Sequence, residues 1–371
     1  MAEQERTYEP GSHPDLPPPM LSSGPIKWVR DNLFSSIPNI VMTVAIVLGL
    51  VALIPPLVNW FFIDAVFDAG SRNECRELGT GACWAIIVVR FSQFVYGFYP
   101  EALRWRVDLA FVLLFVAMAP ILYDKTPFRR YAIIFSCVYP VIASFLLWGG
   151  LGLEPVESAK FGGAMLTVTI GVTGIAASMP LGILLALGRR SKLLVMRVLC
   201  IGFIEFIRGV PLITLLFVAS TLLNYFLPPG SNFDLLLRVL IMVTLFSAAY
   251  LAEVVRGGLA AIPTGQIEAA QALGLSYWKT MGLVVLPQAL KISIPGIVNT
   301  FIGLYKDTTL VVIIGLLDPI GLSRAVLADS KWQGLSTEIY VFIAIFFFLS
   351  CFGMSRYSIY LEKKLETGYK R

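Results

Sequence analysis

The segment that decides the fold runs from Arg256 to Pro287 and has the sequence RGGLAAIPTGQIEAAQALGLSYWKTMGLVVLP. Its residues first predict a short helix. The Thr264 hydroxyl can cap that helix at its start, and Glu268 then lies one turn in, where the positive helix end favours an acidic side chain. Gly274 can adopt the left-handed conformation that ends a helix.

A second short helix is expected directly after Gly274. Ser276 can cap its start, and Pro287 closes the segment where the next apolar run begins. The two helices form a helix–turn–helix between apolar runs at 236–254 and 292–317. This knob is too short to be a domain and too ordered to be a linker, and its shape suits a groove in another protein.

Eight apolar runs lie along the chain. A hydrocarbon core about 30 Å thick requires roughly 20 apolar residues in a helix, and continuous runs favour helices over the alternating pattern of barrel strands. The predicted fold is therefore all-α and integral to a membrane, with about eight transmembrane helices. They are expected near residues 38–60, 108–123, 131–149, 163–187, 209–227, 236–254, 292–317 and 336–355.

The composition supports a membrane protein and excludes several other classes. Hydrophobic residues make up 57% of the 371 residues and charged residues only 14%, whereas soluble domains average about 25% charged residues. Disorder requires the opposite balance of low hydrophobicity and high charge. Only one histidine, His13, is present, so a histidine-based catalytic centre or metal site is not expected.

The distribution of Lys and Arg predicts the side of the membrane that each end of the chain occupies. With the N-terminus in the cytoplasm, about two thirds of the 29 Lys and Arg residues fall in cytoplasmic segments, as the positive-inside rule requires. Both termini are therefore expected in the cytoplasm. The net charge of +5 then reflects loops that face anionic membrane lipid, and no nucleic-acid partner is needed to explain it.

A change in composition near residue 160 divides the chain. Residues 1–36 are polar and Pro-rich, and they predict a disordered cytoplasmic tail that is not a signal peptide. Residues 37–160 are expected to form an N-terminal extension with three spans and a long periplasmic loop. Residues 161–371 hold five spans, whose small residues allow close helix packing and whose prolines predict kinks.

The first external loop contains two features with open alternatives. Cys75 and Cys83 either form a disulfide, which an oxidising compartment would allow, or remain unpaired thiols. There is no CxxC pair, so a metal site is not expected. The aromatic stretch 84–99 is predicted to lie at the membrane interface. The alternative is a ninth span, which would invert the orientation of every later segment.

Several motifs resemble those of one protein family. Glu268-Ala269-Ala270, Gly274 and Leu286-Pro287, with Val284 as the aliphatic residue, match the spacing of the signature loop of ABC importer permeases. Segments 205–212, 249–258 and 306–310 look like the subgroup that imports polar amino acids, although Val210 replaces the usual Thr. The resemblance covers roughly residues 161–371. In length and layout, the extension resembles that of the larger permease of bacterial general L-amino acid systems.

The resemblance implies a five-helix ABC permease core behind a three-helix extension, in the bacterial inner membrane. It also implies two ATPase subunits docked on the 262–276 knob, a second permease subunit, related or identical, and a periplasmic amino-acid-binding protein. No GxxxxGK[ST] phosphate loop occurs in this chain, so ATP and Mg are expected in the partner ATPase, and neither enzymatic activity nor a cofactor is expected here. The candidate ATPase-coupling residues are Thr264, Glu268, Ala269, Ala270, Gly274, Leu286 and Pro287.

Charged residues in the seventh apolar run mark a candidate substrate path. Lys306 and Asp307 are costly inside a membrane, and adjacent helical residues do not pair well, so they need other partners or a break in the helix. Glu253, Glu205 and Arg208 are candidate partners, and Glu253 can also pair with Arg256, three residues along the same helix. One interpretation places them in a wet cavity, where they could meet the carboxylate and ammonium of an amino acid. The other is an interhelical ion pair that holds the bundle. The candidate path comprises Tyr250, Glu253, Asn299, Lys306, Asp307, Thr308 and Thr309.

The functional hypothesis is therefore a permease subunit of an ATP-driven amino acid importer. It would form the translocation path and couple that path to separate ATPase subunits through the knob. The alternative is a stand-alone secondary transporter or channel for small polar solutes. That alternative would depend on an ion gradient and would need no ATPase partner.

Overall fold

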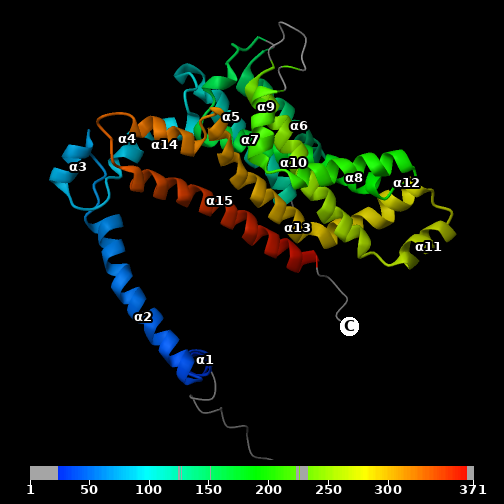
Figure 1. Cartoon of the computed structure of the whole chain (residues 1–371), viewed down its shortest axis with the longest axis horizontal. Coiled ribbons are helices and arrows are strands. Elements are labelled where there is room, and N and C mark those ends of the chain that lie inside the picture. The colour runs from blue at the N-terminus through cyan, green and yellow to red at the C-terminus, as the bar shows by residue number, and fades with distance from the viewer. Residues whose placement is uncertain are drawn as a thin grey trace, which may run out of the picture. The chain divides into compact units, whose positions relative to one another are not determined.

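The computed structural model describes residues 24–123, 126, 128–150, 152–222, 225 and 233–365, and Figure 1 traces the chain. The regular secondary structure of these residues is helical. The α-helices are α1 (Gly24–Leu33), α2 (Ile37–Val58), α3 (Arg72–Leu78), α4 (Ala85–Tyr96), α5 (Arg104–Leu122), α6 (Arg129–Trp148), α7 (Gly163–Arg189), α8 (Leu194–Gly209), α9 (Leu212–Thr221), α10 (Leu235–Ala260), α11 (Thr264–Ala272), α12 (Tyr277–Thr280), α13 (Leu286–Asp307), α14 (Pro319–Leu327) and α15 (Ser336–Leu365). In the described residues, some of these helices are joined by π-helical segments, η1 (Asn59–Ile63) and η5 (Met281–Val285), or by 3₁₀ segments, which include η2 (Glu101–Leu103), η3 (Ser158–Lys160) and η6 (Thr308–Ile314).

Among the described residues, 7 helical segments are long and apolar enough to cross a membrane, and the bent pair α8 and α9 would make an eighth. The all-α integral membrane fold is therefore confirmed. The 7 segments are Ile37–Ile63, Glu101–Leu122, Arg129–Trp148, Gly163–Arg189, Leu235–Ala260, Tyr277–Ile314 and Ser336–Leu365.

The aromatic stretch of the first external loop forms α4. This helix has 12 residues and a length of about 18 Å at 1.5 Å per residue, which is well short of a hydrocarbon core of about 30 Å. By itself α4 is too short to be the ninth span considered above. It packs against α7, α14 and α15.

The contacts within the chain divide it into two compact units, and the first contains α1 and α2. The Thr43 hydroxyl on α2 donates a hydrogen bond of 2.9 Å to the Leu33 carbonyl at the end of α1. Helix α1 differs from the expectation of a disordered tail that extends to residue 36. Pro25 lies in its first turn, where proline is compatible with a helix, and the Asn32 amide donates to the Trp28 carbonyl (2.8 Å). Residues 1–23 of that tail lie outside the described residues.

The second unit is built around α10, which packs against α7, α8, α9 and α13. The extension takes part in this core, because α5 and α6 pack against each other and α6 also packs against α7. Val107 of α5 and Leu147 of α6 belong to the same buried hydrophobic cluster as Met165 of α7 and Val239 of α10. Two helices of the extension therefore fold onto the core that follows them in sequence.

Small residues set the distance between these helices. A Cβ atom at Gly182 of α7 would lie 2.7 Å from Leu251 Cβ and 3.1 Å from the Ala248 carbonyl oxygen, both on α10. A Cβ at Gly174 would lie 3.1 Å from a Leu304 methyl group of α13. The close packing predicted from the small residues of this span is confirmed, as expected for helices that associate without a hydrophobic driving force in lipid.

The pair Gly257 and Gly258 gives a matched test of this packing. A Cβ at Gly258 would collide with the Ala289 carbonyl oxygen and the Ser293 hydroxyl of α13, whereas a Cβ at Gly257 meets nothing within 4 Å. We expect Gly258→Ala to destabilise the protein by about 1–3 kcal/mol and Gly257→Ala to stabilise it by up to about 1 kcal/mol through helix propensity. Thermal unfolding in detergent measures both. Equal shifts in the two variants would contradict the close α10–α13 contact.

The fifth predicted span, at 209–227, is not one straight helix. Helix α8 ends at Gly209, α9 begins at Leu212, and the two axes differ by 102°. Pro211 disfavours the helical conformation at Val210, which is extended with φ −108° and ψ 132°, as expected before proline. Apart from Gly209, where the predicted run begins, the 16 residues of α8 lie in the loop that the sequence predicts between the runs at 163–187 and 209–227. Residues 223–224 and 226–227 of the predicted span lie outside the described residues.

The seventh span begins earlier than predicted. The helical run starts at Tyr277, continues through η5 and α13, and reaches Ile314. Pro287 was expected to close the preceding segment, but it lies in the first turn of α13. Because proline has no N–H to offer the Leu283 carbonyl, the chain widens just before it into the π-helical turn of η5, whose last bond runs from the Leu286 N–H to the Met281 carbonyl.

Candidate functional site

The knob between α10 and α13 has the helix–turn–helix form that the sequence predicts. Helix α11 ends as expected, because Gly274 has φ +73°. The Leu275 N–H bonds the Ala270 carbonyl (3.1 Å) and the Gly274 N–H bonds the Gln271 carbonyl (2.9 Å), which together make a Schellman motif. The predicted start is wrong by one residue, since Pro263 occupies the N-cap and Thr264 is the first helical residue, with no side-chain capping bond. Ser276 occupies the N-cap of α12 but also makes no side-chain cap bond.

One face of α11 is anchored to the rest of the chain. Ala270 is 3% exposed, and the partly buried Ile267 packs against a cluster that includes Met281 and Val285 of η5. The Gln288 amide of α13 donates to the Gln266 amide oxygen across 3.3 Å. The knob is therefore held against the start of the next helical span, so the two segments would move together.

Other side chains of the knob and of the segment after it are exposed. Glu268 and Ala269 are exposed, and Leu273 at the end of α11 is 81% exposed. Trp278 and Leu283, which follow on α12 and η5, are each 71% exposed. Trp278 and Leu283 belong to the candidate span Tyr277–Ile314, whereas Leu273 lies outside every candidate span.

A cluster of arginine and glutamate side chains joins the ends of α7, α8 and α10. Glu253 of α10 pairs with Arg189 of α7 (2.6 Å), with Arg256 one turn along α10 (2.9 Å) and with Arg208 of α8 (3.7 Å). Arg189 also pairs with Glu205 of α8 at 2.9 Å. The Glu253 side chain is 15% exposed, compared with 54% for Glu205, so Glu253 lies at the centre of the group. These five residues form the Glu253 cluster.

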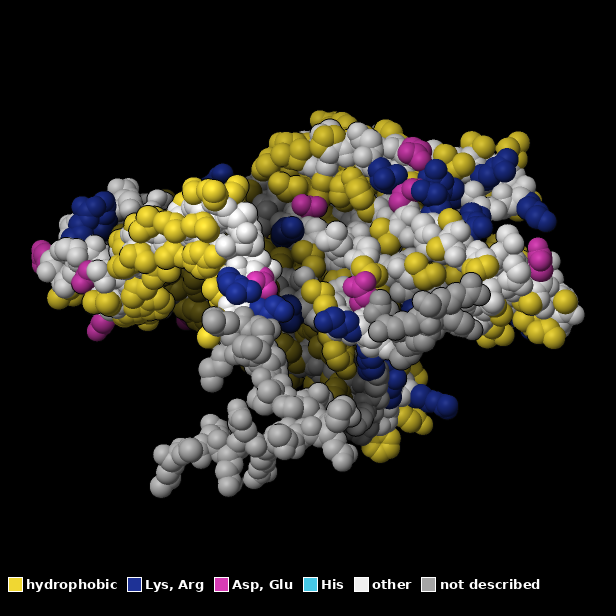
Figure 2. Space-filling model, turned by 90° about the horizontal axis from the view of Figure 1, so that it is seen from below, with side chains coloured by type: hydrophobic (Ala, Val, Ile, Leu, Met, Phe, Trp, Pro, Cys, Tyr) yellow, Lys and Arg dark blue, Asp and Glu magenta, His cyan; other side chains and the backbone are white. Residues whose placement is uncertain are grey.

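Sequence reasoning found only part of this cluster. The spacing of Glu253 and Arg256 predicted their pair, but Glu253, Glu205 and Arg208 were considered as partners of Lys306 and Asp307. Instead they bind one another and Arg189. The guanidinium carbon of Arg208 also lies 5.6 Å from the ring centre of Tyr250, at cation–π distance. Figure 2 shows Lys and Arg side chains gathered toward the end of the displayed face where Figure 1 draws α8, α11 and α12.

The candidate path residues near the end of α13 lie at a change of helix type. Asp307 is the last residue of α13, and the 3₁₀ segment η6 follows it. The Thr308 and Thr309 hydroxyls donate to the carbonyls three residues earlier, at 2.8 and 2.9 Å. The chain therefore changes helix type directly after the charged pair, while the helical run continues to Ile314.

The path residues differ in burial, and the structure does not join them into one hydrogen-bonded set. Lys306 and Asn299 are exposed, Asp307 is half-buried, and Thr308 is 1% exposed. Tyr250 is 37% exposed. Within the described part of the chain, Lys306 and Asp307 form no hydrogen bond or ion pair with Tyr250 or Glu253.

Comparison with known proteins decides the family. The family model described as "binding-protein-dependent transport system inner membrane component" matches residues 178–367. The chain belongs to this family. The matched region begins inside α7 and contains the knob, the Glu253 cluster and α13, so the resemblance to ABC importer permeases based on the 268–287 motif is confirmed.

Two relatives match almost the whole permease. The glutamate/glutamine/aspartate/asparagine transport system permease protein BztC of Rhodobacter capsulatus is 47% identical, over 95% of this chain and 96% of its own. The inner membrane amino-acid ABC transporter permease protein YhdY of Escherichia coli K12 is 50% identical, over 96% of this chain and 97% of its own. A solved amino acid ABC transporter with histidines matches with a TM-score of 0.48 and 27% identity, over 54% of this chain and 91% of that chain. Both long relatives therefore share the N-terminal extension of this permease.

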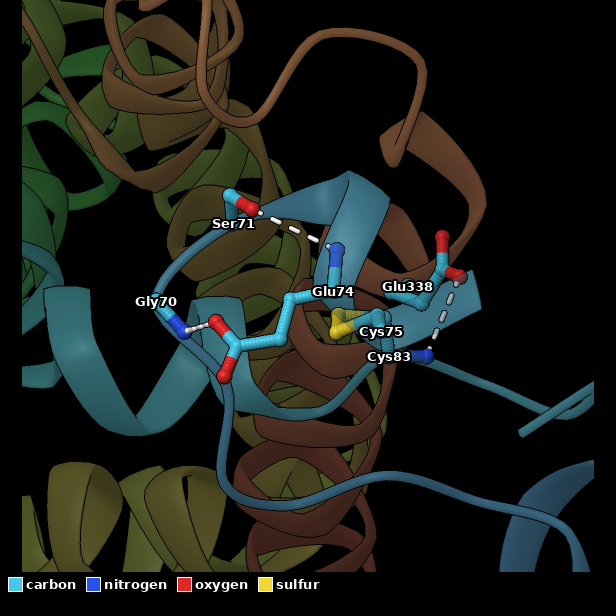
Figure 3. Close-up of a disulfide and its surroundings, with 6 residues drawn as sticks. All are labelled: Gly70, Ser71, Glu74, Cys75, Cys83 and Glu338. Carbon is cyan, nitrogen blue, oxygen red and sulfur yellow. Dashed lines mark hydrogen bonds between the residues drawn. A yellow bond between two sulfur atoms is a disulfide. The ribbon is translucent and has the colours of Figure 1, made fainter. Parts of the chain in front are cut away.

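The loop of the extension contains a disulfide beside the start of α15. Cys75 of α3 and Cys83 form a disulfide with Cα atoms 5.8 Å apart, and both residues are 3% exposed. Figure 3 shows the Cys83 N–H directed at the carboxylate of Glu338 in the first turn of α15, at 3.3 Å. It also shows the Ser71 hydroxyl accepting the Glu74 N–H (3.3 Å), while the Glu74 carboxylate accepts the Gly70 N–H (2.7 Å). Of the two alternatives for these cysteines, the structure contains the disulfide.

A buried carboxylate caps the short helix that follows the path residues. Asp318 is 0% exposed, and its oxygens accept the N–H groups of Gly321 (2.9 Å) and Ile320 (3.3 Å) at the start of α14. Burial raises the pKa of Asp318 to about 6, although these hydrogen bonds oppose the increase. The residue lies outside the membrane-spanning segments.

We expect this burial to make stability depend on pH. Because the pKa of Asp318 is higher in the folded protein, its contribution favours folding below pH 4 and is lost as the pH rises through about 6. Asn is an equally good N-cap, so Asp318→Asn should be more stable than wild type by about 1–3 kcal/mol at pH 7.5, and the difference should vanish near pH 4. Asp318→Ala, which lacks the cap, should be less stable than Asp318→Asn at every pH. Thermal unfolding across this range measures the three proteins, and a gap between wild type and Asp318→Asn that does not change with pH would contradict the assignment.

Proposed function

We propose that this permease is the membrane-spanning subunit of an ATP-driven amino acid importer in a bacterial inner membrane. Two relatives that match nearly the full length bear the names of amino acid permeases, and the family description names an inner membrane component of a binding-protein-dependent system. The permease binds no nucleotide, and ATP and Mg are bound by separate ATPase subunits. Its further partners are a second permease subunit and a soluble amino-acid-binding protein.

The observation that carries the ATPase partnership is the exposed end of α11 in the knob. Leu273 is 81% exposed at the end of a short helix that Ala270 and Gln266 anchor to the rest of the chain. An apolar side chain on a rigid support is suited to a pocket on another protein. One ATPase subunit docks on the knob of each of the two permease subunits. When the two ATPase subunits close on ATP, each knob moves together with η5 and α13.

This arrangement requires the knob and both termini to face the cytoplasm. The excess of Lys and Arg in the segments on that side supports this orientation. The loop of the extension that contains the Cys75–Cys83 disulfide then faces the periplasm, an oxidising compartment in which a disulfide persists.

The experiment that tests the proposed function is uptake by purified complex in proteoliposomes. The permease is reconstituted with its ATPase subunits, with ATP inside and the binding protein plus radiolabelled amino acid outside. We expect uptake that requires ATP and survives collapse of the ion gradients by ionophores. Uptake by the permease alone, driven by a proton or sodium gradient, would contradict the proposal and identify a secondary transporter.

Substitutions at the end of α13 test the candidate path. We expect Lys306→Met and Asp307→Asn each to reduce uptake by at least about tenfold, because a hydrogen bond to a charged substrate group contributes about 1.5–3 kcal/mol. Thermal unfolding should change little if these side chains face a wet path. Lys291→Met, which alters an exposed lysine of the same helix, is the matched control. A loss of stability that parallels the loss of uptake would favour a structural ion pair.

A further inference from the structure

A polar pocket lies where the extension meets the segment between α14 and α15. It has a volume of about 300 Å³ and is lined by Ser71, Arg72, Asn73, Ser330, Lys331 and Gln333. Two of these six residues are cationic and none is acidic. Hydroxyl and amide groups supply the remaining lining, so the Arg72–Lys331 pocket offers hydrogen-bond donors and positive charge to a ligand.

The two cations lack an acidic partner within the described residues. Neither Arg72 nor Lys331 occurs in an ion pair there, and the Arg72 Nε is buried without a hydrogen-bond partner. The neighbouring acids are already engaged. Glu74 accepts the Gly70 N–H, and Asp329 pairs with Arg90 of α4.

Both walls of the pocket are fixed in place. On the extension side, the disulfide begins three residues after Arg72, and Cys83 is bonded to Glu338 (Figure 3). On the other side, Trp332 is 2% exposed, and the Lys331 carbonyl accepts the Arg72 N–H at 2.9 Å. A pre-organised arrangement of this kind lowers the entropy cost of binding.

One glycine allows the guanidinium group to reach its position. Gly334 has φ +85°, and a Cβ there would lie 2.7 Å from Arg72 Cζ. The Arg72 side chain therefore lies against the backbone of the 328–335 segment. A planar guanidinium held in this way presents the fork geometry that matches a carboxylate.

We propose that the Arg72–Lys331 pocket binds a carboxylate side chain on the surface of the soluble binding protein that delivers substrate. This inference rests on the proposed function, which places the pocket on the periplasmic side. A free amino acid fits less well, because its ammonium group would enter a pocket that has two cations and no acid. A glutamate or aspartate side chain of a protein brings only the negative charge. The extension thus adds a docking contact to the permease core.

The test measures the binding-protein concentration that gives half-maximal ATP-driven uptake, in proteoliposomes of neutral lipid at low salt. Exposed ion pairs change affinity by up to about fivefold each, so we expect Arg72→Gln and Lys331→Gln to raise this concentration about fivefold and the double variant about twentyfold. The effect should shrink at high salt because of screening. Arg72→Lys keeps the charge and should lie between wild type and Arg72→Gln.

The controls are Arg76→Gln on the same helix and Lys160→Gln, two exposed cations that do not line the pocket. Both should match wild type, and thermal unfolding checks the fold of every variant. A double variant with the half-maximal concentration of wild type would overturn the proposal. So would competition by free L-glutamate that Arg72→Gln abolishes, because the pocket would then serve the free amino acid. If wild type itself shows no ATP-driven uptake, the proposed function fails instead.

Discussion

Replacing Leu273 by aspartate is expected to abolish coupling of this permease to its ATPase subunits without unfolding it. The side chain is 81% exposed, so the substitution costs the isolated permease little. A carboxylate placed in an apolar pocket of a partner cannot be hydrated or paired there, and losses at such central contacts reach about 2 kcal/mol or more. That corresponds to roughly 30-fold weaker association, and ATP-driven uptake should fall to background.

The same experiment includes three comparisons. Gln271→Asp introduces the same acid on α11 about 200° around the helix from Leu273, at another exposed position, and should retain most of the uptake. Glu268→Ala and Gly274→Ala should also uncouple ATP hydrolysis from uptake, the second because alanine at φ +73° costs about 1 kcal/mol and loosens the Schellman motif. Co-purification of the ATPase subunits is the second readout. Wild-type capture and uptake by Leu273→Asp would show that the knob is not the docking point.

The features predicted correctly from the sequence are those decided by local chemistry. A run such as 336–355 must be helical in a membrane whatever surrounds it, because every backbone polar group needs a partner within its own segment. Gly274 could be identified as the end of α11 for the same reason, since a left-handed residue after a helix favours glycine in any context. The small residues of α7 predicted close approach, and Gly182 against α10 shows it.

The features missed are those in which two local rules compete. At Gly209–Pro211 the apolar run argued for one span with a proline kink, and the chain instead forms two helices with a bend of 102°. At Pro287 the apolar run prevailed, because a π-helical turn absorbs the missing N–H. Sequence periodicity gives no measure of how much backbone adjustment the neighbouring helices will support.

The partners of Glu253 could not be predicted from spacing beyond its own helix. Arg256 is one turn away on α10, but Arg189 and Arg208 come from α7 and α8, and only the packing of three helix ends brings them together. A general signal existed, since intramembrane or interfacial charges usually pair with one another. That rule indicates that Glu253 needs partners of opposite charge, but it does not identify which residues they are.

Removing the Glu253 carboxylate is expected to be among the most destabilising single changes in this permease. It would leave the guanidinium groups of Arg189, Arg208 and Arg256 close together with one remaining acid, Glu205, at the edge of the cluster. Breaking a buried pair costs about 3–5 kcal/mol. Because these arginines are 22–44% exposed, solvent screening reduces our expectation for Glu253→Ala to about 2–3 kcal/mol.

Matched variants separate the lost charge from the lost packing. Glu253→Gln keeps the shape and one acceptor, so it should be less destabilising than Glu253→Ala, and adding Arg256→Gln should recover part of the loss by removing one uncompensated cation. Glu205→Gln changes a 54% exposed acid and should cost no more than about 1 kcal/mol. Thermal unfolding in detergent at low and high salt gives the stabilities, and uptake should fall with them because the cluster joins α7, α8 and α10. If Glu253→Ala unfolded at the same temperature as Glu205→Gln, the cluster would be a set of independent surface pairs and not a junction of three helices.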